Sequence, residues 1–218
     1  MNTQLPIWRR PVFEGVTLFV LASLSVVIQS LPDLGEALQW RRSATFPLKV
    51  ATAFTGHLTH WSWDHLLWDV VAFLGLGIAA IRLVPGRLLI CLVLSALVIS
   101  LEIMLFHPQF ESYRGLSGID SALFGLIVAG LWRQGPPVRY LAMIGLAGFL
   151  GKTTFELLTG DTLFVERAEN DFIPATSAHL SGMVCGLLAG SSKLWTLVKF
   201  FGTPRKGLTP GYANRSRS

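Results

Sequence analysis

The sequence predicts an all-α membrane protein in which six transmembrane helices pack into one bundle. Of the 218 residues, 51% are hydrophobic and only 14% are charged, and the mean hydropathy is +0.53. A soluble domain of average composition carries considerably more charge. The chain also contains long apolar segments, and a helix of about 20 apolar residues satisfies its own backbone hydrogen bonds inside a bilayer.

The predicted spans follow one another with short connections. They cover residues 12–31, 51–81, 88–106, 115–132, 138–158 and 174–197. Turn sequences such as Pro85-Gly86 separate neighbouring antiparallel spans. Residues 1–200 therefore form one predicted six-helix membrane domain, and the polar residues 201–218 form a predicted disordered, basic cytoplasmic tail.

The distribution of basic residues predicts the orientation in the membrane. Under the six-span arrangement one side collects Arg9, Arg10, Arg82, Arg87, Arg133, Arg139 and the basic residues near the C-terminus. Because Lys and Arg are enriched on the cytoplasmic side, both termini are predicted to be cytoplasmic, in a multi-pass protein of the cell inner membrane. The +5 net charge reflects this topology and indicates no nucleic-acid partner.

Three polar clusters lie within the apolar spans, where polar groups are costly and indicate function. They cover residues 56–69, 115–125 and 178–190, near the same predicted end of spans two, four and six. If they meet, they supply a serine hydroxyl, an imidazole to take its proton, and donors for an oxyanion. We therefore expect acyl-transfer chemistry in a site that opens to the periplasmic or extracellular side.

Glycines provide a way for the clusters to meet. Gly182, Gly186 and Gly190 form a stripe along the sixth span, and Gly118 and Gly125 lie about two turns apart on the fourth. Small residues allow membrane helices to approach closely, and this pattern alone is more typical of packing than of catalysis. Close approach of these spans would bring Ser117 within hydrogen-bond reach of His179.

The three clusters resemble the signature elements of the rhomboid intramembrane proteases, in the same order. They are GxSG at 115–118 with Ala122, Leu123 and Gly125 behind it, AHxxGxxxG at 178–186, and HxxxxH at 60–65. The similarity spans residues 55–190. The short chain and the stretch HWSWDHLLWD also resemble a rhombosortase-like branch, which is linked to surface proteins carrying a Gly-Gly C-terminal sorting segment.

The resemblance implies a role for each matching residue. Ser117 would be the nucleophile, and His179 would act as general base and then as acid, without a carboxylate as third member. The oxyanion would be held by the serine N–H, flanked by Gly115 and Gly118, and by side chains at the positions of His65 and Asp69. The implied substrate is a transmembrane or membrane-tethered protein, cleaved near the outer leaflet through an acyl-enzyme, with no cofactor or metal.

Two residues depart from the family pattern. Asp69 stands where the family has an asparagine, and it would either be protonated and donate a hydrogen bond, or pair with His65 one turn away. Ser121 stands where many rhomboids have a tyrosine that stacks on the catalytic histidine, so another group must orient His179. Asp120 is one candidate, although it could equally cap its helix or face a loop.

Other functions remain open from the sequence. A catalytically inactive rhomboid-like protein that binds membrane clients is the main alternative, and a small transporter would require inverted repeats that are absent. His57, His60 and His65 suggest a metal site, but their spacing does not place them on one helical face. Lys152 and Glu156, four residues apart, are expected to neutralise each other within one helix.

Overall fold

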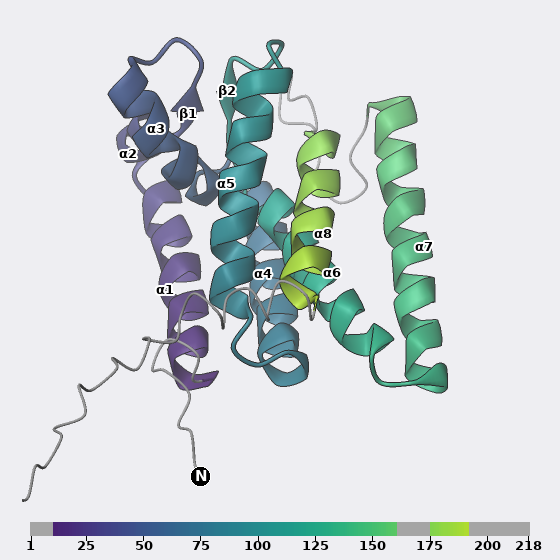
Figure 1. Ribbon diagram of the computed structural model, residues 1–218. Coiled ribbons are helices and arrows are strands. Elements are labelled where there is room, and N and C mark those ends of the chain that lie inside the picture. Colours follow the sequence, from purple (N-terminus) through teal and green to yellow (C-terminus); the bar gives the residue numbers. More distant parts are fainter. Residues whose placement is uncertain (1–10, 161–174, 192–218) are drawn as a thin grey trace, which may run out of the picture.

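The computed structural model describes residues 11–160 and 175–191, and within these ranges the protein is built almost entirely from helices. The long helices run side by side as one bundle, and the short elements gather at one end of it (Figure 1). We call this the α3 end. The elements are α1 (Pro11–Gln29), α2 (Pro32–Leu38), β1 (Trp40–Arg41), α3 (Phe46–Thr55), η2 (Gly56–Leu58), α4 (Trp63–Leu83), α5 (Leu88–Phe106), β2 (Ser112–Tyr113), α6 (Ser117–Trp132), α7 (Pro136–Thr159) and α8 (Thr176–Gly190).

Among the described residues, four helices are long and apolar enough to cross a membrane, namely α1, α4, α5 and α7. The apolar helix α6 has 16 residues, and α8 has 15. Each of these six helices corresponds to one predicted span, so the prediction of an all-α membrane bundle is confirmed. The predicted tail at 201–218 and the last part of the predicted span 174–197 lie outside the described residues.

The predicted span 51–81 is wrong at its N-terminal side. Helix α3 ends at Thr55, a 3₁₀ turn follows, and α4 begins only at Trp63. Ser62 starts α4 because its side-chain oxygen accepts the backbone N–H of His65 at 3.1 Å. The irregular backbone before it is held inside the protein, where the carbonyl of Gly56 accepts N–H groups from Thr59 and Gly115. Apolarity alone did not reveal this break.

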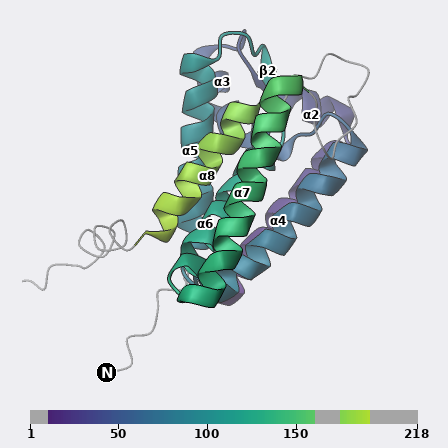
Figure 2. The same cartoon turned by 90° about the vertical axis from the view of Figure 1, so that its right-hand side faces the viewer.

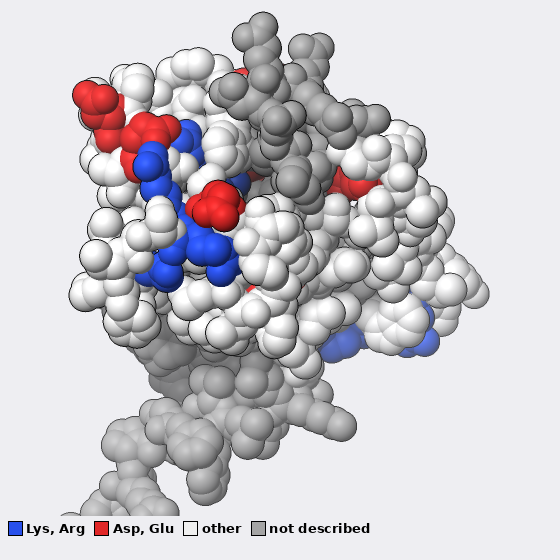
Figure 3. All heavy atoms as spheres, turned by 90° about the horizontal axis from the view of Figure 1, so that it is seen from above, with Lys and Arg blue, Asp and Glu red and all other residues white. Residues whose placement is uncertain are grey.

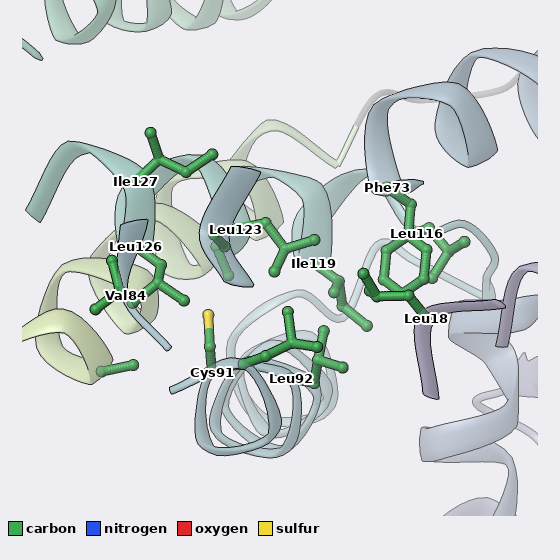
Figure 4. Close-up of a cluster of buried hydrophobic side chains, with 14 of the residues drawn as sticks. Leu18, Phe73, Val84, Cys91, Leu92, Leu116, Ile119, Leu123, Leu126 and Ile127 are labelled. Carbon is green, nitrogen blue, oxygen red and sulfur yellow. The ribbon is translucent and has the colours of Figure 1, made fainter. Parts of the chain in front are cut away.

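Helix α6 forms the centre of the bundle, and its residues dominate the apolar core. Leu123 and Leu126 are completely buried, and they belong to one apolar cluster that also contains Leu18, Phe73 and Cys91 from three other helices (Figure 4). Helix α7 lies at the edge of the bundle beside α8 (Figures 1 and 2). Its leucines are largely exposed, as expected for a surface that faces lipid chains.

Buried charged groups hold the helices together at the end opposite the α3 end. The carboxylate of Glu14 on α1 accepts the backbone N–H groups of Gly86 and Leu88, at 3.1 and 3.0 Å, and thereby caps the start of α5. The guanidinium of Arg87 donates to the carbonyl oxygens of Ala189 and Ser191, at 2.7 and 2.9 Å, at the end of α8. These contacts join α1, the connection between α4 and α5, and the end of α8 at this side of the bundle.

Candidate active site

The segment that leads into α6 places Ser117 at the first residue of the helix. Upstream, β1 and β2 pair antiparallel, with Trp40 opposite Tyr113. Gly115 then adopts φ +120°, a conformation that favours glycine. The backbone N–H of Leu116 donates to Oδ2 of Asp69 at 2.8 Å. The approach to Ser117 is thus fixed by contacts with distant segments, and the serine itself is only half-buried.

Glycines allow α6 and α8 to pack with their backbones in contact. A Cβ atom at Gly182 would overlap the carbonyl oxygen of Gly118, and one at Gly186 would overlap that of Ala122. A Cβ at Gly125 would likewise overlap the carbonyl oxygen of Met183. Gly190 meets the side chain of Ala129 in the same manner. Any larger side chain at these positions would force the two helices apart.

This close packing brings the predicted serine and histidine together. The Nε2 atom of His179 on α8 lies 3.1 Å from the Oγ atom of Ser117 on α6. His179 is buried, with 8% of its surface exposed. The Ser117 hydroxyl can therefore donate to a neutral imidazole whose Nε2 is unprotonated, which is the arrangement required for general-base activation of a hydroxyl.

Asp69 is the centre of a polar cluster beside the serine. Its Oδ2 atom lies 3.2 Å from Nε2 of His65 and 3.2 Å from Nε2 of His60, in addition to accepting the Leu116 N–H. A Cβ at Gly115 would sit 3.0 Å from the His65 ring and 3.3 Å from Oδ2 of Asp69, so this cluster packs directly against the approach to Ser117. The involvement of His60 and Leu116 was not predicted.

His57 and His60 have separate surroundings. The Nε2 of His57 lies 3.1 Å from Oγ of Ser100 and 3.3 Å from the carbonyl oxygen of Ala96, both on α5. Burial lowers the pKa of His57 to about 4, so its ring is neutral at pH 7. Burial also lowers the pKa of His60, although Asp69 acts in the opposite direction. Among the described residues no group of His, Cys, Asp and Glu side chains has the arrangement of a metal site.

Glu156 on α7 approaches the other ring nitrogen of His179. Its Oε2 atom lies 3.3 Å from Nδ1 of His179, while its Oε1 atom accepts from Nζ of Lys152 at 2.5 Å. The predicted Lys152–Glu156 pair is therefore present, but the contact with His179 was missed. The sequence held a partial signal, because Glu156 lies near the end of span 138–158 and His179 near the start of the next span.

The residues next to the serine in α6 make other contacts. The Ser121 hydroxyl donates to the carbonyl oxygen of Ser117 at 2.9 Å, one turn back along the helix. Asp120 is buried, with 7% of its surface exposed. Within ranges 11–160 and 175–191, no hydrogen bond or ion pair joins Asp120 to a histidine, so it does not orient His179 in this arrangement.

Charged side chains connect the α3 end to this site. Arg114 forms an ion pair with Glu36, donates to Oε1 of Gln39 at 2.9 Å and to the carbonyl oxygen of His60 at 3.3 Å, and stacks on Trp61. Burial opposes ionisation of Glu36, but Arg114 and Arg41 outweigh it and lower the pKa of this carboxyl. Basic and acidic side chains accordingly cluster on this face, seen from above (Figure 3).

Comparison with protein-family models gives the family of this chain. The chain has no detectable match among curated proteins. A family model described as Rhomboid domain matches residues 47–196, which is well over half of the chain and includes the polar clusters of α4, α6 and α8. The chain therefore belongs to the rhomboid family, whose members are serine intramembrane proteases.

Proposed function

We propose that this protein is an active intramembrane serine endopeptidase in which Ser117 is the nucleophile and His179 the general base. The observation that carries the proposal is the 3.1 Å contact between Oγ of Ser117 and Nε2 of His179. A hydroxyl is a weak nucleophile unless a base removes its proton, and this imidazole is the base within reach. Inactive relatives that only bind clients have no requirement for such a contact.

The reaction follows from this pair of residues. Oγ of Ser117 attacks the carbonyl carbon of the substrate peptide while its proton moves to Nε2 of His179, giving a tetrahedral intermediate. The imidazolium then protonates the leaving amine, and the acyl-enzyme forms. Water attacks the ester with His179 as base again, which releases the second product and restores the serine.

The start of α6 supports stabilisation of the oxyanion. The first N–H groups of a helix have no acceptor within the helix, and they carry the positive end of its dipole. The N–H of Ser117, at the first position of α6, is therefore a suitable donor. The His65 ring, packed against Gly115, supplies the supporting side chain, and Asp69 holds this ring in place.

The surroundings of Oδ2 of Asp69 favour one of the two interpretations of this residue. Because Oδ2 receives the Leu116 N–H and faces His60 and His65, it serves as an acceptor that orients its neighbours. Donor groups close to a carboxyl oxygen favour the ionised form over the protonated form that would donate to the oxyanion. We therefore assign Asp69 to the support of His65 and the serine segment.

We place the site on the extracytoplasmic side. Arg82, Arg87, Arg133 and Arg139 all flank helix ends opposite the α3 end, which is the pattern of a cytoplasmic face. Both termini are then cytoplasmic. Ser117 and His179 lie toward the α3 end, so we expect cleavage of transmembrane or membrane-tethered proteins near the outer leaflet, including substrates with a Gly-Gly segment.

Cleavage in liposomes tests this function. The protein is reconstituted with a test protein whose single C-terminal transmembrane helix is preceded by Gly-Gly, and a matched substrate carries Leu-Leu instead. We expect cleavage of the Gly-Gly substrate by wild type and none by Ser117→Ala or His179→Ala. Equal cleavage by Ser117→Ala would exclude the proposed nucleophile, and stable co-purification of the intact test protein with wild type would indicate a client-binding role.

A further inference from the structure

His179 has a distinct partner at each ring nitrogen. Nε2 faces Ser117 at 3.1 Å, and Nδ1 faces Oε2 of Glu156 at 3.3 Å. Glu156 is almost completely buried, with 3% of its surface exposed. It lies three residues before the end of α7 and His179 three residues after the start of α8, so the two antiparallel helices bring them to the same level.

Lys152 supports Glu156 as an ionised carboxylate. Its ammonium group binds Oε1 at 2.5 Å, while Oε2 remains directed at the imidazole. An isolated carboxylate in an apolar environment would take up a proton, whereas a neighbouring ammonium favours the charged form. The Lys152–Glu156 pair thus presents one negatively charged oxygen to the catalytic histidine.

Within the described residues, Glu156 is the charged group that meets Nδ1 of His179. Ser121 stands where a stacking tyrosine would be expected, and its hydroxyl is bound to the carbonyl oxygen of Ser117. Asp120 makes no ion pair with a histidine in this part of the chain. Among the described residues, Glu156 is therefore the one placed to orient His179 in the absence of a stacking tyrosine at position 121.

We infer that Glu156 is a positioning residue that completes a Ser117–His179–Glu156 relay, an inference that rests on the proposed serine-protease function. With its proton on Nδ1, His179 faces the Glu156 carboxylate at 3.3 Å, and the lone pair of Nε2 then points at Ser117. When the Ser117 Oγ–H bond breaks and the Oγ–C bond forms, the proton moves to Nε2. The carboxylate keeps its charge throughout and stabilises the imidazolium.

The test measures how fast a fluorophosphonate probe labels the full-length protein in detergent as a function of pH. Glu156→Gln is expected to lower the labelling rate at pH 7 by about 10-fold to 1000-fold, because the amide cannot fix the reactive tautomer. The acid limb of its pH profile is expected to move to lower pH, because the imidazole loses the negative charge that favours its protonation. A purely structural effect would leave that limb in place.

Two further variants separate the possible causes. Glu102→Gln removes a comparable acid on α5, which lies 2.9 Å from His107, and it should leave rate and profile unchanged. Lys152→Met combined with Glu156→Gln removes the unpaired ammonium that the single variant leaves behind, and this double variant should show the same slow rate and shifted limb. If thermal melting shows that Glu156→Gln alone is unfolded, the labelling rate and acid limb of the double variant provide the test of Glu156.

The outcomes distinguish this inference from the proposed function. Labelling of the Glu156 variants at the wild-type rate, or slower labelling with an unmoved acid limb, would overturn the role of Glu156 while leaving the serine–histidine pair intact. Absence of any labelling of wild-type protein, or equal labelling of Ser117→Ala, would instead overturn the proposed function and the relay with it.

Discussion

At the scale of single residues, the proposed site contains two buried acids that a motif search would treat as a departure or as background. Asp69 replaces a family asparagine, yet its Oδ2 gathers the Leu116 N–H, His60 and His65 around one point. Glu156 extends from a neighbouring helix to His179. One buried carboxylate therefore lies beside the segment that leads to Ser117, and the other lies beside Nδ1 of His179.

Replacing Asp69 by asparagine tests its proposed role. We expect Asp69→Asn to slow probe labelling of Ser117 by about 10-fold to 100-fold, because the neutral amide holds His65 and the Leu116 N–H less firmly around the oxyanion. Asp64→Asn, an exposed acid on the first turn of the same helix, is the matched control and should label normally. An unchanged or faster rate for Asp69→Asn would favour the protonated, donating form of Asp69 instead.

The sequence was informative about some of these residues and silent about others. Ser117 and His179 stand out because polar groups in apolar spans are rare and because both lie in recognisable motifs. The contacts of His60 with Asp69 and of Glu156 with His179 were missed, since both depend on how segments that are apart in the chain pack. The predicted ion pair with Lys152, four residues away, already accounted for Glu156, so its contact with His179 was not considered.

At the scale of secondary structure elements, the helix count followed from apolarity but one boundary did not. The segment 51–62 belongs to the predicted span 51–81, yet it forms the last part of α3, a 3₁₀ turn and a short loop. This break depends on long-range hydrogen bonds at Gly56 and on the cap by Ser62. Hydropathy does not predict such tertiary contacts, because it measures only how favourably the side chains of a segment transfer from water to an apolar environment.

The glycine contact between α6 and α8 gives a prediction at this scale. We expect Gly186→Ala to lower the free energy of unfolding by about 3 kcal/mol or more. The added methyl group would overlap the backbone of Ala122, and the backbone of a helix cannot move aside at one residue. The measurement is thermal melting in detergent together with probe labelling of Ser117, which should fall as the helices separate.

Gly148→Ala on α7 is the control for that substitution. A Cβ at Gly148 would meet nothing within 4 Å, and alanine is the better helix former, so melting should be unchanged or slightly higher. If both alanine variants melted at the wild-type temperature, the close packing of α6 against α8 would be contradicted.

At the scale of the whole molecule, the arrangement combines a firmly packed centre with an exposed edge. Helix α6 is surrounded by α4, α5 and α8, whereas α7 has few buried residues and meets the bundle through α6 and α8. The α3 end is closed by the ion pairs around Glu36 and by Arg42, whose guanidinium binds four backbone carbonyl oxygens at and after the end of α5. Ser117 and His179 lie toward the α3 end of the bundle, on α6 and α8.

The proposed orientation predicts which loops are accessible from outside the cell. Ser43, before α3, and Gln134, between α6 and α7, are both exposed at opposite ends of the bundle. A membrane-impermeant maleimide should label Ser43→Cys in intact cells and Gln134→Cys only after the membrane is opened. Cys91 and Cys185 are buried, so background labelling should be low. The reverse pattern would place the site on the cytoplasmic side.

The most direct measurement of the serine–histidine mechanism is the mass of the protein after reaction with a fluorophosphonate. We predict a single adduct on wild type, located by peptide sequencing at Ser117, and no adduct on His179→Ala, because the 3.1 Å contact is what activates the hydroxyl. An adduct on another residue, or one that forms equally fast on His179→Ala, would contradict this mechanism.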